Sequence, residues 1–192
     1  MEYNYSYPHL VAQSENGNFT DEPDLLLLRE CLAQEIGSVI GYTEIAVLVK
    51  DYRIGKIFRQ VANDELNHFA NILQLITGFD PTQAEALKKQ ELMIMTAGSE
   101  EVCPYRSENS KNYRPDAKKG FYPDDPIWDF LQNAIKDELL SINAYQKQVP
   151  VTKNPTIQGL FINIMNKEKE HFVTFTKIFY EVYGLHPESL VL

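Results

Sequence analysis

Cysteine is scarce in this chain of 192 residues, which contains only Cys31 and Cys103. An iron site built from thiolates and a zinc ribbon each need four cysteines, so the sequence excludes both. Two isolated thiols are typical of proteins from a reducing compartment. We therefore expect a cytoplasmic protein whose chemistry does not depend on a cysteine cluster.

Long apolar runs and positive charge are lacking too. The longest apolar runs, such as Leu25–Leu28, are far too short to span a bilayer, and residues 1–20 show no signal-peptide pattern. The formal net charge of -9 argues against nucleic acid and anionic membrane surfaces as partners. We expect neither kind of partner.

Helical patterns dominate the remainder, and the apolar content of 44% is enough for one core. We interpret residues 1–20 as an irregular tail and residues 21–192 as a single domain. Helical hairpins are predicted at about 22–78 and 125–184, with a crossover at about 79–124. Joining two parallel helices of a bundle requires such a long connection, so the predicted fold is an all-α bundle with one crossover.

Local signals set the expected helix boundaries. Pro23 and Pro126 each follow acidic residues, which is typical of a first helical turn. Gly78 and Gly184 are expected to end the second and the last helix. We expect the segment 51–55 to be the turn of the first hairpin.

A set of residues occurs twice, 103 positions apart. Each half contains a lone glutamate, followed thirty residues later by a Glu-x-x-His motif. Duplication of this kind predicts two pseudo-repeated helical hairpins. The two sets are Glu35, Glu65 and His68 in the first half, and Glu138, Glu168 and His171 in the second half.

These residue types at this spacing are typical of a metal site. Positions i and i+3 share one face of a helix, so each motif points its carboxylate and its imidazole the same way. Four carboxylates and two imidazoles can bind two cations and leave positions open for water, peroxide or dioxygen. Mixed oxygen and nitrogen ligation suits iron or manganese. We predict two metal ions, with iron favoured and manganese as the alternative.

Whether the four glutamates are buried distinguishes a metal site from an ordinary charged helix face that is exposed to solvent. Four ionised carboxylates in a core would repel one another, and two divalent cations would cancel their charge. Without metal, some of the carboxylates would have to be protonated, with raised pKa values. Apolar neighbours such as Leu32 and Ile36 beside Glu35, and Leu139 beside Glu138, favour an interior position.

Further polar residues stand near the predicted ligands. Ser38 and Ser141, one turn after the lone glutamates, either leave room or donate hydrogen bonds near the ions, or are small residues at a helix contact. Tyr42 and Tyr145, two turns after them, either hydrogen-bond a ligand carboxylate, relay an electron or are core residues. Asp64 and Asp137 are candidate outer partners for the histidines, with Asp137 favoured. Cys31, four residues before Glu35, is expected to be a buried inert thiol.

At these ligand positions the chain resembles the ferritin-like diiron-carboxylate proteins, which include rubrerythrin, bacterioferritin and the manganese catalases. The resemblance covers about residues 22–185 and rests on Glu35, the motif at 65–68, Glu138 and the motif at 168–171. It implies a ferritin-like four-helix bundle, with a long crossover between the second and third helices. It also implies that the six residues hold a dinuclear iron centre.

The resemblance implies a rubrerythrin-like diiron oxidoreductase that acts on peroxide or dioxygen. The alternatives are a manganese catalase, a ferritin-like protein that oxidises and stores iron, and a metal-free helical scaffold. Rubrerythrins usually carry a further glutamate where this chain has Ser141, and they often carry a rubredoxin domain, which this chain lacks. The electron donor is therefore unknown. A homo-oligomer is expected, and a dimer is favoured.

Overall fold

The computed structural model describes residues 23–90 and 126–184, and this part of the chain is helical with no strand. The predicted all-α class is therefore confirmed for the described residues. The predicted tail at 1–20 lies outside them, as does most of the predicted crossover. The helices are α1 (Pro23–Leu48), α2 (Tyr52–Phe79), α3 (Pro81–Lys89), α4 (Pro126–Gln148) and α5 (Pro155–Tyr183).

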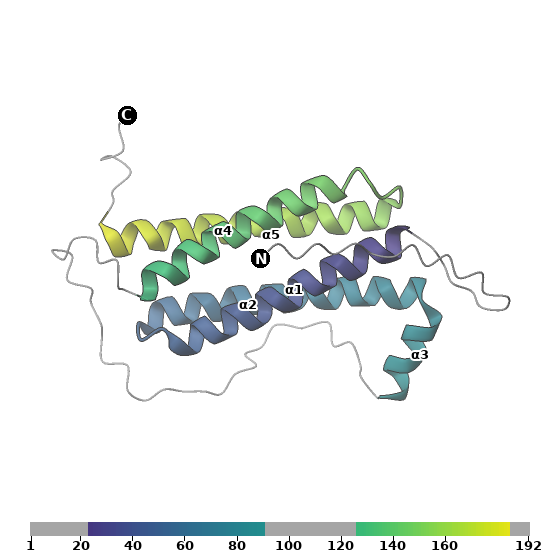
Figure 1. The fold of residues 1–192 in the computed structure, drawn as a ribbon, viewed down its shortest axis with the longest axis horizontal. Coiled ribbons are helices and arrows are strands. Elements are labelled where there is room, and N and C mark those ends of the chain that lie inside the picture. Colours follow the sequence, from purple (N-terminus) through teal and green to yellow (C-terminus); the bar gives the residue numbers. More distant parts are fainter. Residues whose placement is uncertain (1–22, 91–125, 185–192) are drawn as a thin grey trace, which may run out of the picture.

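Two helical hairpins lie side by side and form a bundle (Figure 1). Helices α1 and α2 make one hairpin, and α4 and α5 make the other. Figure 1 shows α1 and α4 running in opposite directions, whereas α2 and α4 run the same way. Short α3 projects from the end of the bundle where α2 ends. Helix α2 therefore ends, and α4 begins, at opposite ends of the bundle.

Side-chain caps fix the starts of α2 and α5. The carboxylate of Asp51 accepts hydrogen bonds from the backbone N–H groups of Arg53 at 2.9 Å and Ile54 at 3.4 Å. Asn154 caps α5 in the same way, and Pro155 occupies the first turn. Such caps satisfy N–H groups that have no partner within the helix. Gly184 ends α5 with a φ of 62°, as predicted.

The predicted turn at 51–55 is wrong, because α2 already begins at Tyr52. Gly55 lies inside the helix, where an added Cβ would come within 3.1 Å of the Ala46 carbonyl oxygen. The glycine thus allows the first turns of α2 to approach the end of α1 closely.

The predicted helix end at Gly78 is also wrong, because α2 continues to Phe79. Asp80 is the residue that separates two helices. Its N–H donates to the Ile76 carbonyl oxygen at 2.8 Å, and its carboxylate accepts from the N–H of Gln83 at 3.0 Å. One aspartate therefore ends α2 and starts α3, so the segment predicted as crossover begins with helix.

Two apolar clusters occupy opposite ends of the bundle. One is centred on Phe58 and Phe175, whose ring centroids lie 4.9 Å apart, and it includes Tyr42. The other packs Tyr145 against Phe161, with ring centroids 5.4 Å apart. Both clusters draw residues from α1, α2, α4 and α5. The middle of the bundle therefore lies between two apolar clusters, one toward each of its ends.

Two apolar residues that were expected inside the bundle lie on its outer surface. Ile36 and Leu139 are expected on an interior face, but they are 37% and 42% exposed. Each follows a buried glutamate by one position, and one residue turns a helix by about 100°. They therefore point away from the interior that encloses their neighbours. Among the described helices, none is both long and apolar enough to cross a membrane.

The Asp51→Ala substitution is expected to destabilise the protein by about 0.5–2 kcal/mol, because it removes the cap of α2. Chemical denaturation monitored by circular dichroism measures the change. Asp51→Asn is the matched control, since an asparagine oxygen can accept the same hydrogen bonds. Equal stability of Asp51→Ala and the unmodified protein would contradict this role.

Candidate metal centre

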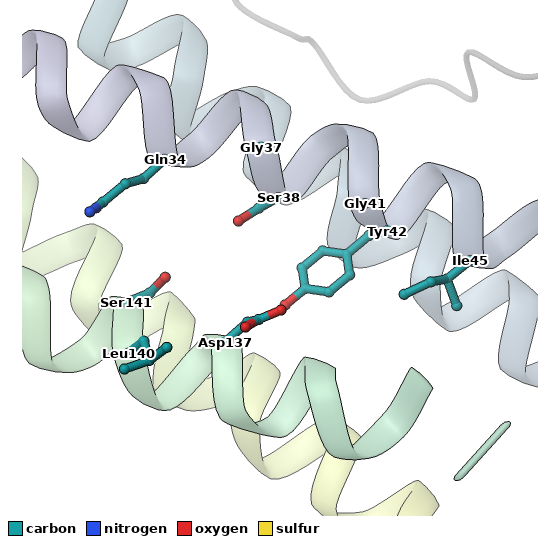
Figure 2. A pocket seen from close by; sticks show the side chains of 9 residues that line it. All are labelled: Gln34, Gly37, Ser38, Gly41, Tyr42, Ile45, Asp137, Leu140 and Ser141. Atoms are coloured by element: carbon teal, nitrogen blue, oxygen red, sulfur yellow. The ribbon is translucent and has the colours of Figure 1, made fainter. Parts of the chain in front are cut away.

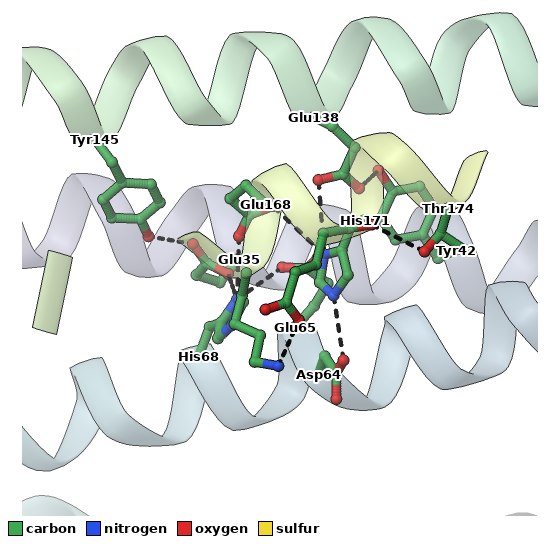
Figure 3. Close-up of polar contacts among 12 residues, drawn as sticks. Glu35, Tyr42, Asp64, Glu65, His68, Glu138, Tyr145, Glu168, His171 and Thr174 are labelled. Carbon is green, nitrogen blue, oxygen red and sulfur yellow. Dashed lines mark hydrogen bonds and ion pairs between the residues drawn. The ribbon is translucent and has the colours of Figure 1, made fainter. Parts of the chain in front are cut away.

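The six residues predicted as ligands come together in the middle of the bundle (Figure 3). The four long helices supply them, and each of the six is between 1% and 6% exposed. Helices α1 and α4 each contribute one glutamate, whereas α2 and α5 each contribute a glutamate and a histidine. Four carboxylates and two imidazoles therefore share one buried layer between the two apolar clusters.

The side chains fall into two groups that could each hold a cation. Within each group the candidate ligand atoms lie within 4.8 Å of one another. Glu65 and Glu168 belong to both groups. The first group adds Glu35 and His68, and the second adds Glu138 and His171. Two neighbouring cation positions that share two carboxylates therefore fit this geometry.

His68 faces more acceptors than it can satisfy. Its Nδ1 atom lies 3.2 Å from one oxygen of each of Glu35, Glu65 and Glu168. One N–H group cannot make a good hydrogen bond to all three. A cation accepts several such oxygens together with the ring nitrogen, so the arrangement suits metal better than a proton.

His171 faces the second group with Nδ1 and the surface with Nε2. Its Nδ1 atom lies 3.0 Å from Glu65 Oε1 and 3.7 Å from one oxygen each of Glu138 and Glu168. Its Nε2 atom lies 3.2 Å from Asp64 Oδ2. The contact with Asp64 therefore leaves Nδ1 directed at the carboxylates.

Several buried polar atoms of the cluster lack a hydrogen-bond partner. Such atoms are rare in folded proteins and costly when nothing compensates them. The chemistry of this set, carboxylate oxygens with one imidazole nitrogen, matches the ligands that iron and manganese accept. The atoms are Glu35 Oε2, Glu65 Oε1, Glu138 Oε2, Glu168 Oε1 and His171 Nδ1.

Two tyrosines hold the lone glutamates across the bundle. The Tyr42 hydroxyl donates a hydrogen bond to Glu138 Oε1 at 2.6 Å, and the Tyr145 hydroxyl donates one to Glu35 Oε1. Each tyrosine thus serves the glutamate of the other hairpin. Burial and the adjacent carboxylates raise the pKa of both tyrosines, which keeps them protonated as donors. Of the roles considered for them, the hydrogen bond to a predicted ligand carboxylate is present.

Burial shifts the two lone glutamates toward their protonated forms. It raises the pKa of Glu35 to about 7 and that of Glu138 to about 8. Burial acts in the same direction at Glu168, but the nearby imidazoles of His171 and His68 outweigh it and lower the pKa of Glu168 to about 2. The same two histidines lower the pKa of Glu65 against the effect of burial.

The two imidazoles are shifted toward their charged forms. Burial opposes the charge, but the nearby carboxylates of Glu168, Glu35 and Glu65 raise the pKa of His68 to about 11. Asp64 and three buried glutamates likewise raise the pKa of His171. Without metal, the cluster therefore balances its carboxylates with protons on its own imidazoles and lone glutamates.

A pocket of about 330 Å³ lies between α1 and α4 beside the cluster (Figure 2). Ser38 and Ser141 line it from opposite helices, so both serines leave open space. Buried Tyr42 forms its inner wall, and exposed Leu140 lies at its outer side. The remaining lining residues are Gln34, Gly37, Gly41, Ile45 and Asp137.

The favoured outer partner of the histidines is wrong. Asp137 lines the pocket and contacts no histidine within the described ranges, whereas Asp64 bonds His171. The position of Asp64 beside Glu65 in the sequence does not show which helix its side chain faces. Burial raises the pKa of Cys31 to about 12, which fits the predicted inert thiol.

Comparison with known proteins finds no matching family model, no similar curated protein and no similar solved structure.

Metal binding is expected to release at least two protons per chain at neutral pH. Both imidazoles and Glu138 are protonated there without metal, and metal ligands must lose their protons. Affinity should fall as the pH falls, because protons then compete better for the same atoms. Titration calorimetry in buffers of different ionisation enthalpy measures the protons released. Binding without proton release would contradict the described charge state.

Proposed function

We propose that this protein is a dinuclear non-haem metal oxidoreductase, most like rubrerythrin, that acts on peroxide or dioxygen. The observation that carries the proposal is the pair of buried ligand groups that share Glu65 and Glu168. A structural ion needs only one closed set of ligands. Two adjacent sets of ligands can hold two metal ions, which suits a reaction in which the oxidant takes one electron from each ion.

A ferritin-like four-helix bundle with duplicated hairpins is the proposed scaffold. The reciprocal hydrogen bonds support it, since Tyr42 reaches Glu138 and Tyr145 reaches Glu35. Equivalent residues of two repeats would exchange contacts in this way across a two-fold axis. The long crossover of this fold stays a prediction, because residues 91–125 lie outside the described ranges.

Iron is the proposed metal, with manganese as the alternative. Carboxylate and imidazole ligands suit both. When bound, two such ions would supply electrons to the oxidant and act as Lewis acids toward it. The inert thiol of Cys31 does not compete for them, since burial keeps it protonated.

The protein's own residues prepare the site for this chemistry. Tyr42 and Tyr145 each hold Oε1 of a lone glutamate, and Oε2 of both glutamates is left without a hydrogen bond. Those free oxygens are available to cations. The apolar clusters on either side exclude water, which strengthens electrostatic interactions within the layer.

The pocket between α1 and α4 is the proposed route for the oxidant. It extends from exposed Leu140 to buried Tyr42, whose hydroxyl bonds a proposed ligand. Peroxide and dioxygen are much smaller than its volume of about 330 Å³. Ser38 and Ser141 contribute to this space, since larger side chains there would fill it.

The partners and location of the protein stay predictions. The electron donor is unknown, a homodimer is favoured, and the two isolated cysteines suggest the cytoplasm. Manganese catalase, iron oxidation with storage, and a metal-free scaffold are the competing functions. A catalase would need no donor, because peroxide then serves as both oxidant and reductant.

Protein loaded anaerobically with ferrous iron is expected to be oxidised by one equivalent of peroxide per pair of ions, without release of oxygen. Stopped-flow absorbance follows the ferric product, and an oxygen electrode follows the gas. Oxygen release without a donor would instead favour the catalase. A product that grows beyond two ions per chain would favour iron storage.

Glu168→Gln should weaken iron binding by at least ~100-fold, more than the loss of an outer partner costs, because both groups lose a shared carboxylate. Glu170→Gln is the matched control, since it makes the same change on the exposed side of the same helix. Equal iron loading of both variants would refute the proposed centre.

A further inference from the structure

The two imidazoles of the cluster differ in what their outer nitrogens contact. His171 Nε2 lies 3.2 Å from Asp64 Oδ2, so a carboxylate lies behind this ring (Figure 3). His68 also directs Nδ1 at the carboxylates, but no side chain in the described part of the chain lies within hydrogen-bonding distance of its Nε2. The two rings thus face equivalent glutamates, but only the ring of His171 has a carboxylate at its outer nitrogen among the described residues.

The difference originates in the two Glu-x-x-His motifs. Asp64 directly precedes Glu65 in the first motif, and the residue at the same place in the second motif is Lys167. Lys167 cannot accept a hydrogen bond from a histidine, and its Nζ pairs with Glu170 at 2.7 Å on the exposed side of α5. The first motif therefore supplies a carboxylate to the histidine of the other hairpin, whereas the second does not return one.

An outer carboxylate changes the metal affinity of a histidine. It accepts the N–H of the ring nitrogen that does not bind the ion, which fixes the ring orientation and makes the ligating nitrogen more basic. Removing such a partner typically costs 10–100-fold in metal affinity. Among the ligands of the two groups, Asp64 makes this contact with His171 of the second group.

We propose that Asp64 makes the two cation positions unequal. The position formed with His171 and Glu138 fills first and holds its ion more tightly than the position formed with His68 and Glu35. Asp64 acts as a positioning residue, since it touches the histidine and not the ion. This inference rests on the dinuclear centre of the proposed function.

Unequal positions have a consequence for how the centre assembles. The first ion takes up charge from Glu65 and Glu168, which both positions share, and it repels the second ion. Because the two positions share these carboxylates, the first and second ions differ more in affinity than the effect of Asp64 alone would make them. When metal is scarce, the protein carries one ion beside His171, and the complete pair forms only when metal is plentiful.

Titration with Mn²⁺ alone tests the inequality, because electron paramagnetic resonance detects the free ion. The unmodified protein is expected to bind two ions in two steps that differ by at least about 10-fold in affinity. Asp64→Ala should weaken the tight step by a similar factor and leave the loose step unchanged. Asp64→Asn should have an intermediate effect, since its amide oxygen still accepts the hydrogen bond but carries no charge.

A gain of affinity provides the complementary test. Lys167→Asp places a carboxylate at the position that corresponds to Asp64, so it should tighten the loose step. Lys169→Asp is the matched control, because it makes the same change of charge on α5, where the lysine contacts Asn166. The control should leave the ratio of the two affinities as it is.

The outcomes separate the inequality from the centre itself. Two equal steps in the unmodified protein, or an equal loss in both steps for Asp64→Ala, would overturn the inequality and leave the dinuclear centre intact. Failure of the unmodified protein to bind Mn²⁺ would overturn both. Asp64 is about half exposed, and circular dichroism of each variant verifies that its helices are retained.

Discussion

Four carboxylates and two imidazoles lie in one buried layer, and the arrangement of the bundle follows from that burial. Unscreened, the carboxylates would repel one another strongly, so protons or cations must balance them. The raised pKa values of Glu35, Glu138 and His68 describe the balance by protons. Each tyrosine hydroxyl leaves one oxygen of a lone glutamate free, and a free oxygen could bind a cation that balances the negative charge of the layer.

The sequence was sufficient to predict the cluster of six residues because the positions of such side chains are constrained locally. A Glu-x-x-His motif puts two side chains on one helical face in any helix, and its duplication indicated that two faces meet. The helix class was equally predictable, since Pro126 and Gly184 carry local signals that no distant contact overrides. The six residues accordingly lie together as expected.

Features set by contacts between helices were beyond the sequence. Ile36 appeared to belong to an interior face, but α1 is apolar on nearly all sides and its pattern does not show which side is covered. Gly78 resembled a helix end, yet the cap of Asp80 two residues later determines where α2 stops. The sequence favours Asp137 over Asp64 as the outer partner, and only the packing of α2 against α5 shows that Asp64 is the one that contacts His171.

In the proposed centre, the shared glutamates hold a pair of cations between them. Crystals of protein grown with ferrous iron under anaerobic conditions, measured above and below the iron absorption edge, test it most directly. Two anomalous peaks per chain are expected, one beside His68 and one beside His171, both in contact with Glu65 and Glu168. Iron-loaded crystals with no peak within this layer would contradict it.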